Sequence, residues 1–207
     1  MDTEKEKQLP FLTGTLPQIL TAQAARFGTN GAAIREKAYG NWQTYNWQDY
    51  LRYVRQAGLG LIALGFRRGE AVGLITDNHP EWLFSELGVQ AVGGVTLNLF
   101  TSAVVEELSA SLNRIRATFV IVQDQEQVDK MIAARGKLSH VRNVIFIDPT
   151  GMSFSGDDPW LVSFRDLLSG GERLDCDRPE LFPGELHRGN PEETAMMIQT
   201  SGTTGMP

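Results

Sequence analysis

The stretch EAVGLITDNHPEWLFSELGVQAVGGVTLNL, residues 70–99, decides the fold class. Its first part, EAVGLITDN, is a compact apolar run closed by turn residues, which is typical of a buried parallel strand. A helix is expected next, because Pro80 stands near its start and Gly93 and Gly94 stand at its end. The apolar run VTLNL then predicts a second strand. A strand, a helix and a strand in this order predict a βαβ unit.

The same alternation continues along the chain. Apolar residues recur at helical spacing over residues 47–64, and Gly65 follows where a left-handed cap residue belongs. Downstream, Ser102 can cap a helix over residues 103–117. A further helix is expected over 126–138, and apolar runs predict strands over 118–123 and 141–148. Together these elements predict an α/β fold with an open, mostly parallel sheet flanked by helices.

The N-terminal part adds two elements to this unit. A short amphipathic helix is expected within residues 15–28, between a possible Thr cap and a terminating Gly. A hairpin is expected around residues 39–41, with Trp42, Tyr45 and Trp47 as aromatic strand formers. We expect these three aromatic side chains to belong to the core.

The C-terminal third has a different amino-acid composition. Residues 149–191 are rich in Gly, Pro and acidic residues, which predicts a long irregular connection with helix only over residues 163–168. The single cysteine, Cys176, is expected to lie in a surface loop, and it excludes an internal disulfide or a clustered thiolate metal site. The segment ETAMMIQT, residues 193–200, then returns to strand-like content.

Composition excludes several classes of protein. The 207 residues are 42% hydrophobic, enough for a buried core. A net charge of -6, with 19 Lys and Arg spread along the chain, argues against a sequence-independent nucleic-acid binder. No apolar run reaches the roughly 18 residues of a spanning helix. Residues 1–10 form a polar leader without the apolar centre of a signal peptide, so a cytoplasmic protein is expected.

Isolated charged and titratable residues carry little functional signal. His79, His140 and His187 are far apart and lack metal-ligand spacing, so we interpret them as solvated or turn residues. Arg67 and Arg68 are expected to form an exposed pair at a helix end, where positive charge is favourable. No catalytic triad and no single catalytic residue is assigned.

The C-terminal sequence TSGTTGMP, residues 200–207, carries the strongest signal of a binding site. Its glycines permit tight bends that expose backbone N–H groups to an anion, and its hydroxyls can bind phosphate or Mg²⁺. The candidate residues are Thr200, Ser201, Gly202, Thr203, Thr204 and Gly205. The spacing does not fit a Walker A loop, because only two residues separate the glycines. On these residues alone a flexible Ser/Thr/Gly linker remains an equal alternative.

The loop and the upstream stretch together resemble one family. TSGTTGMP is similar to the phosphate-binding signature of the AMP-forming acyl-adenylate synthetases. Further landmarks are GFRRGE before a strand, NHPEW at a helix start and a Gly-Gly pair before the next strand. The resemblance runs in order over residues 11–207 and leans toward long-chain fatty acyl-CoA ligases. Departures are Gln199, where the family often has an aromatic residue, and Asn98 and Ser102 in the segment NLFTS.

The resemblance implies a function and its ligands. Residues 11–207 would be the N-terminal part of the family's large domain, truncated within the phosphate-binding loop, because the adenine, acyl and coenzyme A contacts would lie beyond Pro207. The parent enzyme would use ATP and Mg²⁺ to activate a fatty acid as acyl-AMP and would transfer it to coenzyme A. Thr200 would provide the Mg²⁺-linked hydroxyl, and residues 201–205 would wrap the β- and γ-phosphates.

Two alternatives and one partner stay open at this point. The fragment itself is expected to be inactive, and a non-catalytic α/β binding or assembly module is the alternative reading. An adenylate-forming enzyme for another carboxylate is a second alternative. Peripheral contact with the inner membrane surface is compatible with a fatty acid substrate, whereas nucleic acid is not expected as a partner.

Overall fold

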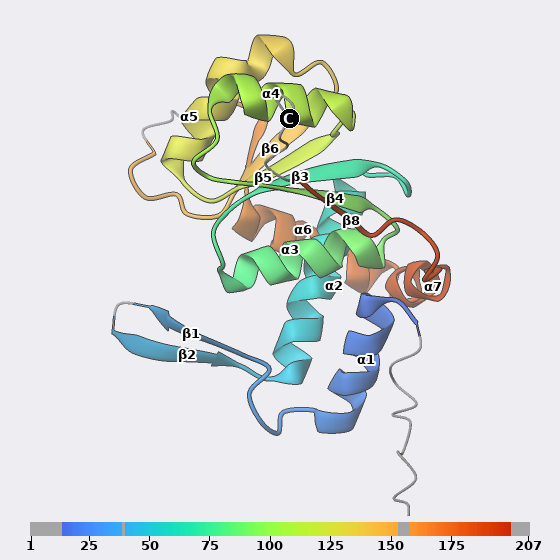
Figure 1. Ribbon diagram of the computed structural model, residues 1–207. Coiled ribbons are helices and arrows are strands. Elements are labelled where there is room, and N and C mark those ends of the chain that lie inside the picture. The colour runs from blue at the N-terminus through green and yellow to red at the C-terminus, as the bar shows by residue number, and fades with distance from the viewer. Residues whose placement is uncertain (1–13, 39, 153–157, 200–207) are drawn as a thin grey trace, which may run out of the picture.

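A six-stranded parallel sheet forms the centre of the protein, for which the computed structural model describes residues 14–38, 40–152 and 158–199. The strand order is β7-β6-β5-β3-β4-β8 (Figure 1). The strands are β3 (Ala71–Ile75), β4 (Val95–Leu99), β5 (Phe119–Val122), β6 (Asn143–Phe146), β7 (Leu161–Ser163) and β8 (Met196–Ile198). A separate antiparallel hairpin joins β1 (Ile34–Ala38) to β2 (Asn41–Tyr45). The predicted α/β fold with an open parallel sheet is confirmed.

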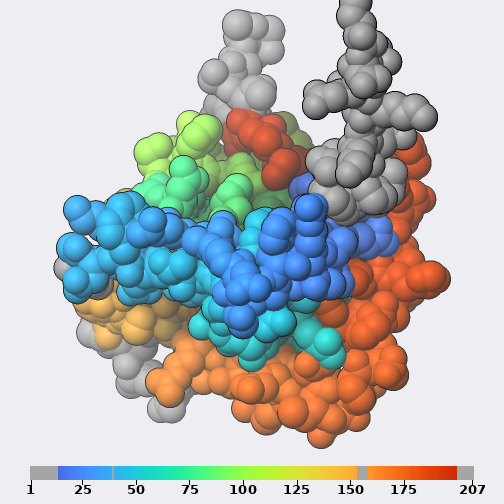
Figure 2. All heavy atoms as spheres, turned by 90° about the horizontal axis from the view of Figure 1, so that it is seen from below, coloured from blue at the N-terminus to red at the C-terminus, as the bar shows by residue number. Residues whose placement is uncertain are grey.

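Helices cover both faces of the sheet (Figure 1). One face carries α4 (Val105–Arg114) and α5 (Gln125–Ala134), which is followed by the short 3-10 helix η1 (Arg135–Lys137). The other face carries α2 (Trp47–Ala63), α3 (Pro80–Ala91) and α6 (Phe164–Asp177). Outside α2 and α3 lie α1 (Leu16–Phe27) and α7 (Leu181–His187), which share a third apolar cluster with them. The hairpin and α1 lie side by side across this outer face (Figure 2).

The two central strands explain why the sheet is so apolar. Every residue of β3 and of β5 is buried, because helices cover both sides of these strands. Leu108 and Met131 fill the core on the side of α4 and α5, whereas Leu61, Phe84 and Leu167 fill the core on the opposite side. A continuous apolar run is therefore the correct sequence signal for these strands, since neither face meets water.

Glycines allow α2 to approach its neighbours closely. A Cβ atom added to Gly171 of α6 would lie 1.9 Å from the carbonyl oxygen of Gln56 in α2. A Cβ atom on Gly58 of α2 would likewise lie 2.7 Å from the carbonyl oxygen of Gly88 in α3. No side chain larger than hydrogen fits at these contacts without a shift of the helices.

Most of the predicted helix ends are confirmed. Thr15 precedes α1, and its backbone N–H donates to Oε1 of Gln18 at 2.9 Å. Gly65 has a φ of 88°, which suits the cap position expected after α2. Pro80 is the first residue of α3. The expected cap at Ser102 is wrong, because α4 begins after Val104 and Ser102 lies in the preceding turn.

The prediction of an irregular connection over residues 149–191 is wrong for much of its length. β7, the 14-residue α6 and α7 lie within it. Ser163 caps α6 by accepting a hydrogen bond from the backbone N–H of Asp166. The helix then continues through Gly170 and Gly171, because contact with α2 compensates for the low helix propensity of glycine. Cys176 is exposed as expected, but it lies in α6 and not in a loop.

The aromatic residues of the N-terminal part divide into different roles. Tyr45 packs against the core as expected. Trp42 does not, because it points from the hairpin into solvent with 59% of its surface exposed. Trp47 is the first residue of α2 and not part of a strand. It packs against the outer apolar cluster, as expected of a core residue, and its ring stacks on Phe27 with centroids 5.7 Å apart.

Candidate functional site

The predicted phosphate-binding loop follows a strand that ends beside β4. β8 pairs in parallel with β4, and its last residue, Ile198, lies opposite Asn98. Because the strands are parallel, the carboxyl ends of β3, β4 and β8 meet at one edge of the sheet. The predicted residues Thr200, Ser201, Gly202, Thr203, Thr204 and Gly205 lie outside the described residues. Their roles stay predictions, but the strand that leads into them is described.

This edge of the sheet contains a topological switch point. The chain leaves β3 through α3 on one face, and it leaves β4 through α4 on the opposite face. Where neighbouring strands send their connections to opposite faces, the loops diverge and leave a crevice between them. In open α/β sheets this crevice is the usual place for a ligand.

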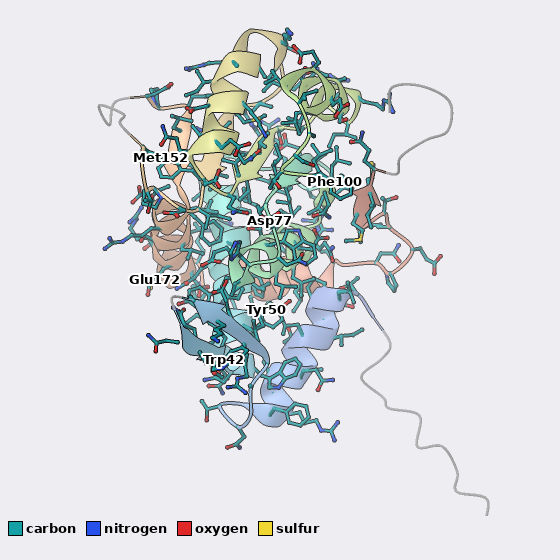
Figure 3. The ribbon with its side chains drawn as sticks, turned by 60° about the vertical axis from the view of Figure 1, so that its left-hand side comes forward. Trp42, Tyr50, Asp77, Phe100, Met152 and Glu172 are labelled. Carbon is teal, nitrogen blue, oxygen red and sulfur yellow. The ribbon has the colours of Figure 1, made fainter. Side chains whose placement is uncertain are left out.

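A crevice of about 690 Å³ occupies this position. It is lined by Thr76, Asp77, Asn78, Trp82, Asn98, Leu99, Phe100, Thr101, Ser102 and Ile198. Figure 3 shows Phe100 close to β8 and Asp77 nearer to the middle of the molecule. The only charged side chain in this described lining is the carboxylate of Asp77. A polyphosphate at this edge would therefore need cations or N–H groups from residues other than this lining.

Hydrogen bonds hold the two loops that flank the crevice. The hydroxyl of Thr101, after β4, donates to Oδ1 of Asp77, after β3, at 3.1 Å. The backbone N–H of Asp77 donates to Oε1 of Gln123 at 2.7 Å. Nζ of Lys130, in α5, donates to the carbonyl oxygen of Thr101 at 2.6 Å. The ends of β3, β4 and β5 are thus cross-linked by polar contacts around the crevice.

Hydrogen bonds connect the wall of the crevice nearest α3 to the buried carboxylate of Glu86. Nε1 of Trp82 donates to Oδ1 of Asn98 at 2.7 Å, and Nδ2 of Asn98 donates to Oε2 of Glu86 at 3.1 Å. Oε1 of Glu86 accepts from Thr96 at 2.7 Å and from Gln90 at 2.5 Å. Burial raises the pKa of Glu86, and the hydrogen bonds from Thr96, Asn98 and Gln90 oppose that rise.

The last described residue is anchored to the other face of the sheet. Oε1 of Gln199 accepts a hydrogen bond from the hydroxyl of Ser111, in α4, at 3.1 Å. Gln199 is one of the departures from the resemblance described above. Here a polar side chain contacts a polar partner on α4, so the chain is fixed just before the predicted loop begins.

The structure shows the contacts of two residues, Arg68 and His79, that the sequence analysis treated as isolated. Arg68 is not an exposed partner of Arg67, because only 21% of its side chain is exposed and its Nη2 donates to Oε2 of Glu185 at 2.9 Å. It links the turn before β3 to α7. His79 is the residue before α3, where its side chain makes no capping hydrogen bond, and its Nδ1 lies 2.8 Å from Oε1 of Glu36 in the hairpin. Across residues 14–38, 40–152 and 158–199, no three His, Cys, Asp or Glu residues form a metal site.

Sequence reasoning missed the polar residues that build this crevice. Glu86 had a signal, since it is an acid within the otherwise apolar face of the helix EWLFSELGVQA. Asp77 also had one, because it directly follows a buried strand at the edge where ligands bind. The contacts of Lys130 with Thr101 had no such signal, because they join positions far apart in the sequence.

Comparisons with known proteins agree on one family. A sequence profile described as AMP-binding enzyme matches residues 20–207. The chain is 25% identical over 201 residues to the long-chain-fatty-acid–CoA ligase ACSBG1 of Rattus norvegicus, with 97% of this chain and 26% of that protein covered. It is 28% identical over 196 residues to the long-chain-fatty-acid–CoA ligase heimdall of Drosophila melanogaster, with 93% and 28% covered. The chain thus spans about a quarter of the length of these curated relatives.

Two solved structures with the same fold are described as CoA ligases. The anthranilate CoA ligase AuaEII in complex with anthranoyl-AMP matches with a TM-score of 0.60 and 24% identity, over 72% of this chain and 27% of that chain. A putative long-chain-fatty-acid CoA ligase from Rhodopseudomonas palustris matches with a TM-score of 0.60 and 20% identity, over 75% and 37%. At these identities the likeness shows the fold alone.

Proposed function

Because the chain belongs to the AMP-binding enzyme family, we propose that it is part of an AMP-forming ligase that joins a long-chain fatty acid to coenzyme A. The observation that carries the proposal is the geometry of β8. This strand runs parallel to β4 and leads residue 199 to the edge where the crevice opens. Ligands bind at this edge in open α/β sheets, and TSGTTG is the next sequence along the chain.

The proposed reaction has two steps, with ATP and coenzyme A as co-substrates. A carboxylate oxygen of the fatty acid attacks the α-phosphorus of ATP, which forms acyl-AMP and breaks the bond to pyrophosphate. The thiol of coenzyme A then attacks the acyl carbon, AMP leaves with the original carboxylate oxygen, and the thiol proton is released. Negative charge builds on the departing pyrophosphate in the first step, so stabilisation of that charge is the main task of the binding loop.

The loop residues are proposed to perform that task. Bends at Gly202 and Gly205 would direct backbone N–H groups at the phosphates, and the hydroxyls of Ser201, Thr203 and Thr204 would donate to the same oxygens. The described lining of the crevice contributes no cation, so these donors and a metal ion would compensate the negative charge of the phosphates. Their value depends on preorganisation, which the contact between Gln199 and Ser111 supports.

A Mg²⁺ ion at this site would need only one or two protein ligands. Mg²⁺ usually keeps several waters and binds one or two protein oxygens together with substrate phosphates. The oxygen donors at this edge include the predicted hydroxyl of Thr200 and the carboxylate of Asp77, which is held by Thr101. Bound Mg²⁺ would neutralise charge on the phosphates. We propose Thr200 as its ligand in this chain.

A cytoplasmic location with peripheral contact at the inner membrane surface is the proposed setting. Among the described helices, none is long and apolar enough to cross a bilayer. Register places Arg35, Lys37, Trp42 and Thr44 on one face of the hairpin, and the Arg35 guanidinium carbon lies 4.8 Å from the centroid of the Trp42 ring. Cations contribute about 1 kcal/mol each near anionic lipid, so this contact would be weak and reversible. Loss of sedimentation with phosphatidylserine vesicles in Arg35→Glu, but not in Arg52→Glu, would support it; equal sedimentation of both variants would refute it.

The test of the proposed function measures pyrophosphate release by the complete protein that contains this chain. We expect release with long-chain fatty acids in the presence of ATP and Mg²⁺. Thr200→Ala should lower kcat by about 100-fold, because one preorganised donor to a developing charge is lost. Thr200→Ser keeps the hydroxyl and is the matched control, with a rate close to that of the wild type.

The outcomes separate the alternatives. Release with amino acids or aryl acids but not with fatty acids would contradict the substrate and leave adenylation standing. An unchanged kcat in Thr200→Ala would favour the linker interpretation of residues 200–205. No release with any carboxylate would favour a non-catalytic binding or assembly module.

A further inference from the structure

Glu86 is an unusual residue for its position. It lies in α3 with 4% of its surface exposed, and most of the other buried residues of this helix are apolar. The three side chains that donate to its carboxylate, Gln90, Thr96 and Asn98, are all neutral. A buried charge with neutral donors costs stability unless its hydrogen bonds are well made. Its presence is therefore better explained by what it orients than by what it stabilises.

The hydrogen bonds from Glu86 outward have a fixed direction. Nδ2 of Asn98 donates to Oε2 of Glu86 at 3.1 Å, so the carboxyl group holds this end of the Asn98 side chain. The indole of Trp82 only donates, so Asn98 must turn its Oδ1 toward Nε1 of Trp82. If the Asn98 carboxamide were rotated by 180°, its Nδ2 group would face the Nε1–H donor of Trp82. Its Oδ1 atom would face the acceptor Oε2 of Glu86. The carboxylate thus selects one orientation of Asn98, and that orientation provides the acceptor for Trp82.

The chain of hydrogen bonds from Glu86 through Asn98 to Trp82, which we call the relay, ends at the wall of the crevice. Asn98 and Trp82 both line the crevice at the carboxyl edge, and Asn98 lies opposite Ile198 of β8. Trp82 also lines a neighbouring cavity of about 380 Å³ between the hairpin and the start of α3. The indole therefore forms part of the wall of both spaces. A change in its position would alter the shape of the crevice next to the strand that leads into residues 200–205.

We propose that Glu86 is a positioning residue for the nucleotide edge of the sheet: through Asn98 it fixes the Trp82 indole in the crevice wall. Tyr50, from α2, is the titratable neighbour on the other side, and burial together with the charge of Glu86 raises its pKa to about 12. It therefore stays neutral near pH 7. The effect on catalysis rests on the proposed function, whereas the effect on Trp82 does not.

The experiment uses the complete protein labelled with 5-fluorotryptophan and observed by ¹⁹F NMR. Trp82→Phe assigns the Trp82 resonance by its loss. Glu86→Met removes the acceptor at similar length, and Asn98→Leu breaks the relay one step further on. We expect both variants to shift or broaden the Trp82 resonance, and we expect the double variant to change it no more than either single variant. If Glu86→Met fails to fold, Glu86→Gln carries the test, because it keeps the length of the side chain and removes the carboxylate.

Thr96→Val is the matched control, because it removes a hydrogen bond to the same carboxylate without touching the relay. Thr96 binds Oε1, whereas Asn98 binds Oε2. If Glu86 only anchors α3 to β4, Thr96→Val should disturb the Trp82 resonance as much as Glu86→Met does. If the relay positions Trp82, the resonance in Thr96→Val stays at the wild-type position.

The rate of pyrophosphate release completes the test. We expect kcat to fall about 10-fold or more in Glu86→Met and in Asn98→Leu, because a small misplacement at a binding edge is costly, and to stay within about 2-fold in Thr96→Val. An unmoved Trp82 resonance, or a moved resonance with unchanged kcat, would overturn the proposal. A wild-type protein that releases no pyrophosphate while its Trp82 resonance responds as expected would instead overturn the proposed function.

Discussion

The carboxylate of Glu86 shows how single residues shape this protein. It is buried in α3, and neutral donors replace the water that it loses. Burial raises its pKa from the ordinary value of 4.5, so the folded protein binds the proton more tightly than the unfolded chain does. The sequence marks Glu86 only as an acid in an apolar helix face. Its partners in β4 could not be predicted, because they depend on how α3 packs on the sheet.

The raised pKa of Glu86 predicts a pH dependence of stability. As the pH rises from about 4.5 through the raised pKa, the folded state must release a proton that the unfolded state has already lost. The free energy of unfolding therefore falls in this window and stays lower above it. Glu86→Gln lacks this contribution, so its stability relative to the wild type should rise with pH across the window and then become constant.

Urea unfolding of both proteins at a series of pH values measures this difference. Glu81, whose pKa is also raised by burial, is present in both proteins and cancels in the comparison. A difference in unfolding free energy that does not change with pH would show that Glu86 keeps an ordinary pKa in the folded protein.

At the scale of elements, the spacing of apolar residues predicted most of the helices and strands. Apolar runs and helical spacing identified the strands β3 to β6 and the helices α1 to α5, because each forms from residues close in sequence. The same approach found only the first part of α6 and missed residues 169–177, whose sequence SGGERLDCD contains two glycines and many charges. The helix forms there because α2 offers a surface that only a glycine can approach. A contact between distant segments leaves no local pattern.

The two adjacent glycines of α6 give a matched test of this explanation. Alanine favours a helix over glycine by about 1 kcal/mol when nothing else changes. Gly170→Ala should follow this rule and stabilise the protein by roughly 0.5 to 1 kcal/mol, because the nearest atom to its added Cβ is Nη2 of Arg173 at 3.8 Å.

Gly171→Ala should have the opposite effect. Its Cβ would lie 1.9 Å from the carbonyl oxygen of Gln56, so α2 and α6 would have to separate. Overpacking of this kind typically costs about 1 to 3 kcal/mol. Thermal or urea unfolding measures both variants, and stabilisation by Gly171→Ala would mean that the close contact between α2 and α6 is wrong.

At the scale of the whole molecule, the sheet topology defines the candidate site. The position of the crevice follows from the strand order and from the faces on which α3 and α4 lie. The order of elements in the sequence predicted a parallel sheet, but it did not give the order of the strands. Residues 200–205 were identified from sequence and resemblance alone, and their phosphate contacts stay predictions.

The most direct test of the proposed reaction follows a carboxylate oxygen. The complete protein is incubated with a long-chain fatty acid labelled with ¹⁸O in both carboxylate oxygens, together with ATP, Mg²⁺ and coenzyme A. If the carboxylate attacks the α-phosphorus, one labelled oxygen must leave with AMP when the thiol displaces it. Mass spectrometry should therefore find AMP that carries one ¹⁸O atom for each acyl-CoA formed. Unlabelled AMP, or label in inorganic phosphate, would contradict an acyl-AMP intermediate and with it the proposed function.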